Sequence, residues 1–344
     1  LNDFNQTIGS LAGGGAAGGS VNLGTATLTT GGRNATTNYA GVIGGTGGLT
    51  KTGTGVQYLS GSNTFSGPTS VNAGYLVLQN NSALGGSTAT VASGATLQLE
   101  NNINLAGNAV TISGTGVGGT RGALASWSGD NTWGGSVTLA ADSSFFVASG
   151  NFTISGAIGG GYAVTKTGNG ALILSGANDY TGGTTAGAGT LALGASNVLP
   201  DTTNVTLGGA TLAASSFTDT VGTLEVTGTA TISLDSGGAM VFADSSAVAW
   251  TGTLNITGTF VPGASIRFGT TSGGLTSHRP RFLALRNLGG PGRGLRWRRQ
   301  QRRCEKRSRL DLRRARQGRQ RARPPAHRRQ LRSRLPHLQL PPEG

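Results

Sequence analysis

Histidine and cysteine are missing from the first 276 residues, because His278, His327, His337 and Cys304 all lie beyond them. A Ser-His-Asp hydrolase needs an imidazole beside its nucleophile, and zinc sites commonly use His or Cys ligands. This part of the chain therefore excludes both chemistries, and we expect no catalytic site, no metal site and no cofactor. A chain without cysteine forms no internal disulfide, which is compatible with threading through a second membrane.

Charged residues are also scarce, at 12% of the chain, and helix-forming residues are rare before residue 276. The 62 glycines, together with abundant Thr, Val, Ile and Asn, are typical of short strands and turns. No apolar run approaches the length of a membrane-spanning helix, so none is predicted. The chain starts at Leu1 without a basic and apolar leader, which predicts a mature form or a fragment.

The net charge of +14 is concentrated in one segment. Residues 1–276 carry five basic and ten acidic side chains, whereas residues 277–344 carry 22 basic and three acidic ones. The basic segment could be an arm for nucleic acid or an anionic surface. It also resembles out-of-frame translation of GC-rich codons, which the abrupt change at Thr276 favours. We therefore predict a disordered basic tail over residues 277–344, with no specific nucleic-acid partner.

Residues 43–84 and 158–199 are two copies of one repeat, identical at 19 of 42 aligned positions without a gap. Both copies contain a Thr-Lys-Thr-Gly sequence, which indicates a strand that passes into a turn. Two residues later, Gly55 and Gly170 are predicted to supply a turn position with positive φ.

The remaining positions of the repeat predict strands and further corners. Apolar residues at alternate positions, Val56 and Tyr58 in the first copy and Ala171 and Ile173 in the second, indicate strands with one buried face. Further corners are predicted at Asn63 and Asn178, since asparagine suits sharp bends and bonds to its own backbone, and at Gly74 and Gly189.

The same rhythm of three- to five-residue strands and Gly, Asn or Ser corners continues outside the copies. A β-sandwich would need longer strands joined by hairpins, whereas a parallel β-helix needs short strands and three corners per turn. With roughly 20–25 residues per turn, residues 1–276 would form about 12 turns, a rod on the order of 55–60 Å long. The predicted strands outside the copies are 90–92, 95–99, 109–112, 137–139, 145–147, 152–154, 204–207, 211–213, 223–226, 230–234, 240–242, 253–256 and 265–268.

The two copies resemble the passenger-associated transport repeat, also called the autotransporter-associated β-strand repeat. They follow its pattern G-L-T-K-T-G-x-G-x-x-x-L-S-G-x-N-T-Y-x-G-x-T, with departures at Ala163, Val164 and Asp179. The segments 122–139 and 249–269 resemble other parts of such proteins.

This resemblance implies an all-β fold, a right-handed parallel β-helix (β-solenoid), outside a bacterium or at its cell surface in association with the outer membrane. It implies a structural or adhesin-like scaffold that assists export or presents surface regions, and no shared catalytic residues. The partner would be an extracellular surface or a glycan that the sequence does not identify. The oligomeric state is left open.

A polysaccharide-active β-helix enzyme is the alternative, since such enzymes use pairs of carboxylates. The available aspartates mostly stand beside Gly, Ser, Asn or Thr, as corner residues do, and we predict structural corners. They are Asp130, Asp142, Asp179, Asp201, Asp219, Asp235 and Asp244.

Two further motifs have structural explanations. Residues 114–119 match GxGxxG, but a dinucleotide site also needs a following helix, and residues 120–129 show no helical period. Trp127, Trp133 and Trp250 could form a carbohydrate-stacking surface, although we predict that they fill the interior or the end of the solenoid.

Overall fold

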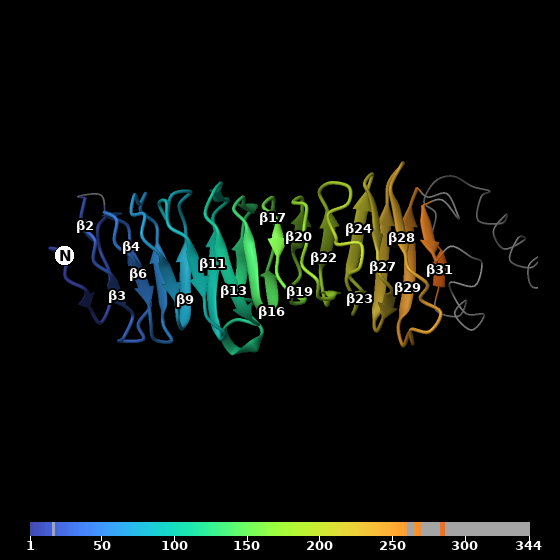
Figure 1. Ribbon diagram of the computed structural model, residues 1–344, viewed down its shortest axis with the longest axis horizontal. Helices are drawn as coiled ribbons and strands as arrows, with labels where there is room; N and C mark the ends of the chain where they lie inside the picture. Colours follow the sequence, from blue (N-terminus) through green and yellow to red (C-terminus); the bar gives the residue numbers. More distant parts are fainter. Residues whose placement is uncertain (16–17, 260–264, 270–282, 286–344) are drawn as a thin grey trace, which may run out of the picture. The chain divides into compact units, whose positions relative to one another are not determined.

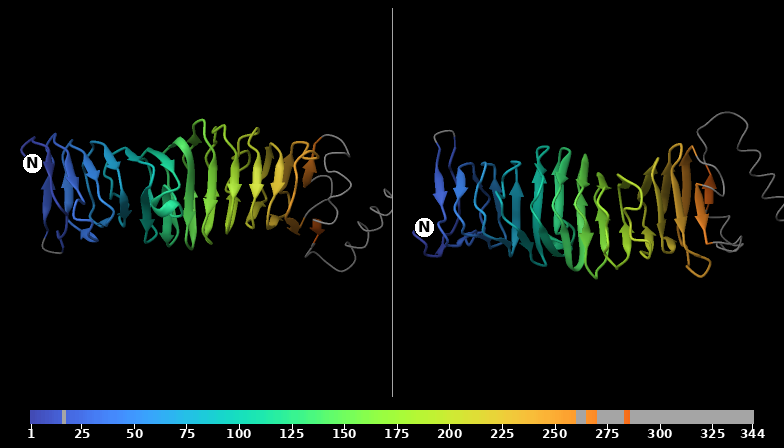
Figure 2. Two further views of the ribbon diagram at one scale, coloured as in Figure 1. Left: turned by 90° about the horizontal axis from the view of Figure 1, so that it is seen from below. Right: turned by 45° about the horizontal axis from the view of Figure 1, so that its top comes forward.

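The computed structural model describes residues 1–15, 18–259, 265–269 and 283–285, all within one compact unit of residues 1–289. They form a parallel β-solenoid of about 12 turns, stacked along one axis from β2 to β31 (Figures 1 and 2). The predicted all-β parallel β-helix is thus confirmed; its handedness stays a prediction. The described residues contain one short helix, the 3-10 turn η1 (Val117–Gly119).

The turns contribute strands to three faces, and every strand pairing in the described residues is parallel. Face 1 starts with these strands, of which β16 bends and continues onto face 2: β1 (Gln6–Thr7), β3 (Leu28–Thr30), β6 (Leu49–Lys51), β8 (Thr69–Val71), β10 (Ala89–Val91), β13 (Val110–Gly114), β16 (Val137–Val147) and β18 (Ile158–Gly159). Backbone bonds through Asp179 and Asn197 connect this face to its last strands, β25 (Thr218–Val221), β28 (Ala239–Phe242) and β30 (Ile266–Phe268).

Face 2 is formed by the strands from β4 to β26. Its strands are β4 (Thr37–Tyr39), β7 (Val56–Leu59), β9 (Gly74–Leu78), β11 (Ala95–Glu100), β14 (Leu124–Ser128), the second half of β16, β19 (Val164–Thr167), β21 (Thr184–Ala186), β23 (Val205–Leu207) and β26 (Leu224–Val226).

Face 3 begins with a two-stranded piece and continues as a nine-stranded sheet. Its strands are β2 (Ser20–Asn22), β5 (Val42–Gly44), β12 (Asn104–Leu105), β15 (Asn131–Trp133), β17 (Asn151–Ile154), β20 (Ala171–Leu174), β22 (Thr190–Leu193), β24 (Thr211–Ser215), β27 (Thr229–Leu234), β29 (Thr253–Gly258) and β31 (Leu283–Leu285). Strand β31 lies beyond Thr276 and pairs with β29. The other residues of the predicted tail lie outside the described residues. The predicted boundary of the solenoid at Thr276 is not tested and stays a prediction.

One continuous apolar column fills the solenoid from Leu11 to Ile256. The strands alternate buried and partly exposed residues, as β24 and β27 show, because successive side chains point to opposite faces of a strand. Each fully buried Leu, Ile or Val contributes about 1.5–3 kcal/mol. The predicted strands therefore occur close to their expected places, for example β10, β17 and β29.

The phase of the strand after Thr-Lys-Thr-Gly is opposite to the prediction in both copies. Gln57 and Leu59 point inward in β7, while Val56 and Tyr58 lie partly exposed. In β20 the inward residues are likewise the second and fourth, and Ala171 and Ile173 are not buried. The buried Gln57 amide is accommodated because its Nε2 donates to the carbonyl of Tyr58 and its Oε1 accepts the hydroxyl of Thr37.

The two repeat copies lie on different faces. From Leu49, register pairs lead through Thr69, Ala89, Val110 and Val137 to Ile158, which is five turns further on face 1. The residue that matches Leu49 is Val164, which instead lies on face 2, paired with Ser143. The second copy is therefore rotated by one face, about a third of a turn, relative to the first.

Candidate functional site

The lysines of the two Thr-Lys-Thr-Gly corners are buried inside the solenoid. Lys51 and Lys166 have exposed fractions of 1% and 0%. Lys51 Nζ donates to the carbonyls of Thr52 (2.7 Å), Gly53 (2.9 Å) and Ala73 (3.2 Å). The third of these carbonyls belongs to the next turn, so the ammonium group joins two turns.

Lys166 repeats this geometry with the carbonyls of Thr167 (2.9 Å), Gly168 (2.8 Å) and Ala188 (3.1 Å). Burial lowers the pKa of both lysines to about 8, because desolvation disfavours the charged form. At neutral pH the three donors of the ammonium group thus match three carbonyl acceptors. This contact between turns was not predicted from the sequence, although the presence of Lys at the same position in both copies indicates a common role.

The corner glycines have different roles from those predicted. Positive φ occurs at Gly53 (69°) and Gly168 (80°), within Thr-Lys-Thr-Gly itself, and not at Gly55 or Gly170. Gly170 is required for close approach instead, since a Cβ there would lie 2.6 Å from Val147 Cγ1 and 2.8 Å from the carbonyl oxygen of Gly150.

The repeat asparagines bridge turns and do not form bends of their own. Asn63 Oδ1 accepts the N–H of Ile43 in the preceding turn (2.8 Å), and its Nδ2 donates to the carbonyl of Ala83 in the next (2.6 Å). Asn178 does the same between the N–H of Ile158 (2.7 Å) and the carbonyl of Val198 (2.6 Å). Each amide therefore needs both its acceptor and its donor.

The aspartates do not gather in one groove. Asp130 and Asp142 are exposed corner residues whose Oδ1 atoms accept the N–H groups of Asn151 and Ala163. In the same way Asp244 accepts the N–H of Ser246. Asp179, Asp201 and Asp235 are exposed. Within the described residues no group of three His, Cys, Asp or Glu side chains is suited to a metal ion.

Asp219 differs from the other aspartates because it is buried, with an exposed fraction of 1%. Its Oδ2 accepts the N–H groups of Val198 (3.1 Å) and Leu199 (2.9 Å), and its Oδ1 has no hydrogen-bond partner among the described residues. Burial raises the pKa of the carboxyl group to about 6, the backbone N–H groups of Leu199, Val198 and Thr220 oppose this, and the charge of Asp201 adds to it. The sequence pattern gave no sign of this burial.

The three tryptophans do not form one surface. Trp133 is fully buried, and Trp250 is nearly so, with its Nε1 donating to the carbonyl of Leu224. Trp127 is the exception to the predicted interior role, because it is 39% exposed. It stacks against Phe146, and the guanidinium of Arg121 covers both rings.

The GxGxxG segment is an extra loop in one turn. Leu97 and Leu124 are paired across 27 residues, where neighbouring turns need about 20. Residues 114–119 end β13 and form η1, after which β14 follows and not an α-helix. As predicted, the structure offers no helix N-terminus there for a pyrophosphate.

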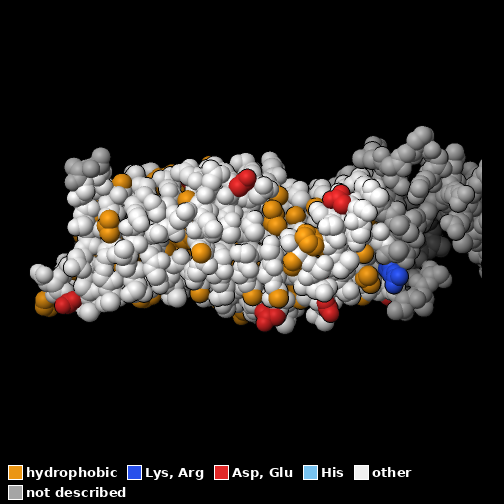
Figure 3. Space-filling view, turned by 90° about the horizontal axis from the view of Figure 1, so that it is seen from above, with side chains coloured by type: hydrophobic (Ala, Val, Ile, Leu, Met, Phe, Trp, Pro, Cys, Tyr) orange, Lys and Arg blue, Asp and Glu red, His pale blue; other side chains and the backbone are white. Residues whose placement is uncertain are grey.

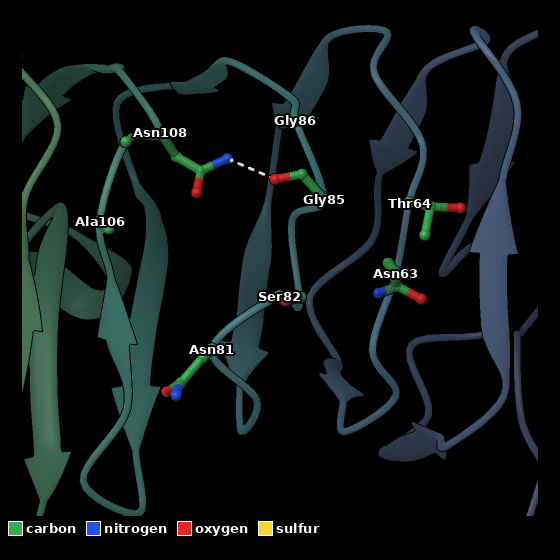
Figure 4. Close-up of a pocket in the computed structure, with 9 residues that line it drawn as sticks. Asn63, Thr64, Asn81, Ser82, Gly85, Gly86, Ala106 and Asn108 are labelled. Carbon is green, nitrogen blue, oxygen red and sulfur yellow. Dashed lines mark hydrogen bonds between the residues drawn. The ribbon is translucent and has the colours of Figure 1, made fainter.

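A polar hollow of about 400 Å³ is present on face 3 between β5 and β12, where two successive turns do not form strands (Figure 4). None of its lining residues carries a charge; they are Asn63, Thr64, Asn81, Ser82, Gly85, Gly86, Ala106, Gly107 and Asn108.

Two asparagines of this hollow each have one polar atom committed to the solenoid. Asn81 Oδ1 accepts the N–H of Asn104, and Asn108 Nδ2 donates to the carbonyls of Gly85 and Ser87. The Nδ2 of Asn81 and the Oδ1 of Asn108 make no hydrogen bond with the described residues. The hollow therefore offers at least one donor and one acceptor to a ligand.

The residues that the sequence analysis named in the basic segment cannot be placed in the structure. His278, His327, His337 and Cys304 are outside the described residues. Among the helices of the described part, none has the length and apolar character to cross a membrane.

Comparison with known proteins places both copies in one repeat family. The passenger-associated transport repeat matches residues 49–78 and 164–197. Over 78 residues the chain is 46% identical to the Adhesin BmaC autotransporter of Brucella suis biovar 1 (strain 1330). That match covers 22% of this chain and 2% of the Brucella protein. No solved structure matches the chain significantly. The chain therefore carries two passenger-associated transport repeats within a parallel β-solenoid, and both findings are consistent with a fragment of an autotransporter passenger.

Proposed function

We propose that this β-helix is a non-enzymatic scaffold of a surface adhesin, which contacts extracellular ligands through its outer surface and presents the regions attached to it. A passenger of this type is extracellular or exposed at the cell surface. The proposal rests on the structure of the two repeats, which belong to one solenoid and whose buried lysines and repeat asparagines form hydrogen bonds between successive turns. Such bonds favour a stiff rod, which suits presentation at a distance from the cell.

The outer surface is consistent with contact through neutral polar groups. In the view of Figure 3, hydrophobic side chains are scattered and few charged groups are visible. The enzyme alternative has less support, because catalytic carboxylates of glycosidases face one another across a bond. Here Asp130 and Asp142 each bond to a backbone N–H at a corner, and Asp219 is buried.

The hollow on face 3 is the part of this surface that we assign to ligand contact, with an uncharged glycan as the ligand class. Sugar hydroxyls both donate and accept hydrogen bonds, which matches the available Nδ2 of Asn81 and Oδ1 of Asn108. Acidic sugars would find no cation in the lining. The hollow is also specific to the first copy, since the positions that match Thr64 and Gly86 in the second copy are Asp179 and Asp201.

Filling the hollow is expected to reduce glycan binding without unfolding the protein. A Cβ on Gly107 would contact nothing within 4 Å, and the backbone there does not have positive φ. We therefore expect Gly107→Trp to fold normally and to lower the affinity for neutral oligosaccharides by at least about tenfold, or 1.4 kcal/mol. Binding of the full chain to an array of neutral and acidic oligosaccharides measures this effect.

Gly32→Trp is the matched control, because Gly32 is equally open and lies outside the hollow. Its binding and melting temperature should equal those of the wild type. Wild-type protein that binds no neutral oligosaccharide, or Gly107→Trp protein that binds as well as the wild type, would contradict the assignment of the hollow. The scaffold proposal would survive either result, and it would fail if the displayed chain conferred no adhesion to any host surface.

A further inference from the structure

The column of side chains that contains Asn178 continues through Val198 to Asp219, two turns further on. Asn178 Nδ2 donates to the carbonyl of Val198, and Asp219 Oδ2 accepts the N–H of the same residue. The series Ile158, Asn178, Val198 thus repeats the series Ile43, Asn63, Ala83 of the first copy. Like both asparagines, Asp219 accepts a backbone N–H from the turn before it.

An ionised carboxylate can form only one of the two inter-turn hydrogen bonds that each asparagine forms. Asparagine accepts a bond from the turn before and donates one to the turn after, whereas a carboxylate only accepts. Asp219 Oδ1, the atom in place of the donor, is buried and has no partner among the described residues. A buried polar atom without a partner is costly, and an ionised one more so. Protonation removes the charge and gives the carboxyl group one O–H donor.

The groups around Asp219 do not provide a countercharge. Opposite it on β28 lies the apolar Met240. The hydroxyl of the buried Tyr180 is hydrogen-bonded to the hydroxyl of Thr184, which in turn is hydrogen-bonded to the hydroxyl of Thr203. These groups are uncharged. The negative charge of the exposed Asp201 acts in the same direction as burial, so that both favour the neutral carboxyl group.

We propose that Asp219 is an acid-operated latch between turns, which is closed when its carboxyl group is protonated and open when it is ionised. The turns that it joins, from residues 198–199 to β25 and β28, are held together more firmly in mildly acidic medium than at neutral pH. An Asn at this position would make the junction insensitive to pH, because its amide does not titrate in this range.

The sign of the pH dependence follows from linkage. The folded-state pKa of Asp219 is raised to about 6 from the ordinary 3.8, so the folded chain binds more protons than the unfolded chain between these values. The contribution of Asp219 to stability is therefore fully present below pH 3.8 and is lost as the pH rises through 6. This corresponds to a change on the order of a hundredfold in the unfolding or opening constant.

Asp219→Asn in the full chain tests the proposal. The variant should be more stable than the wild type at pH 8 and should approach it at pH 4, when urea unfolding and hydrogen exchange of the Val198 and Leu199 amides are measured. Asp235→Asn is the matched control, since Asp235 is exposed, and it should follow the wild-type pH profile. Parallel profiles of wild type and Asp219→Asn, or a less stable variant at pH 8, would overturn the proposal.

The reciprocal exchange tests the same idea even if Asp219→Asn does not fold. Asn178→Asp places a carboxyl group two turns earlier in the column and should add a second acid-stabilised junction. Its stability relative to the wild type should fall as the pH rises from 4 to 8. An Asn178→Asp protein with a pH-independent loss of stability would show that the carboxyl group does not act as a latch at this column.

Discussion

Replacing Lys166 by methionine is expected to destabilise the solenoid by about 3 kcal/mol at neutral pH. Methionine retains the apolar stem but removes three charge-assisted bonds, to the carbonyls of Thr167, Gly168 and Ala188. Each such bond contributes about 1.5–3 kcal/mol, and the saved desolvation of the ammonium group offsets part of the loss. Urea unfolding followed by far-UV circular dichroism measures the difference.

Arg33→Met is the matched control for this experiment. Arg33 is an exposed cation, so its replacement should change stability by less than about 0.5 kcal/mol. Lys51→Met should cost as much as Lys166→Met, and the two losses should add, because the sites are five turns apart and share no partner. If the lysine variants are as stable as the arginine variant, the ammonium groups do not join the turns.

The pH profile provides a second measurement of the same site. Burial lowers the folded-state pKa of Lys166 to about 8 from 10.5, so the unfolded chain binds more protons between these values. Stability of the wild type should therefore rise with pH across this window. The Lys166→Met protein should lack that part of the rise, and a profile identical to that of the wild type would contradict the assignment.

The strands could be predicted from the sequence because two local signals agree. Alternation of apolar and polar residues marks a strand, and Gly or Asn marks the corner, so that strands such as β10 and β17 occur where expected. The three-faced coil follows, since such short strands bury a core only by stacking.

The rotation of the second copy by one face could not be predicted in the same way. It depends on the summed lengths of five turns, and one of these is lengthened by the loop that contains η1. An offset of 115 residues is compatible with several turn lengths, and only the register pairs decide among them.

The burial of Lys51 and Asp219 could not be predicted from the sequence pattern either. A lysine or an aspartate next to a turn is more often solvated than buried. Lys51 and Asp219 become buried because the neighbouring turns bring backbone carbonyls or N–H groups to their side chains. The carbonyl of Ala73 and the N–H of Leu199 belong to residues about 20 positions away, which no short motif records.

The last prediction concerns the left-handed corner of the repeat. Gly168 has a φ of 80°, and a Cβ on it would contact the carbonyl oxygen of Val147 and the ring of Phe146. The left-handed conformation costs an alanine about 1–2 kcal/mol of free energy, and the backbone shift that relieves the contacts costs about 1–3 kcal/mol more. We therefore expect Gly168→Ala to lower the free energy of unfolding by about 3 kcal/mol, again measured by urea unfolding.

Gly32→Ala provides the control, because Gly32 is open and outside the positive-φ region. Gly53→Ala, the same change in the first copy, should cost as much as Gly168→Ala, since Gly53 has a φ of 69° and a Cβ there would contact the carbonyl oxygen of Gly31. The two glycines lie at corners between different pairs of faces. Equal losses would therefore show that the Thr-Lys-Thr-Gly corner is a self-contained unit whose stability does not depend on the face that it follows, whereas unequal losses would show that the face matters.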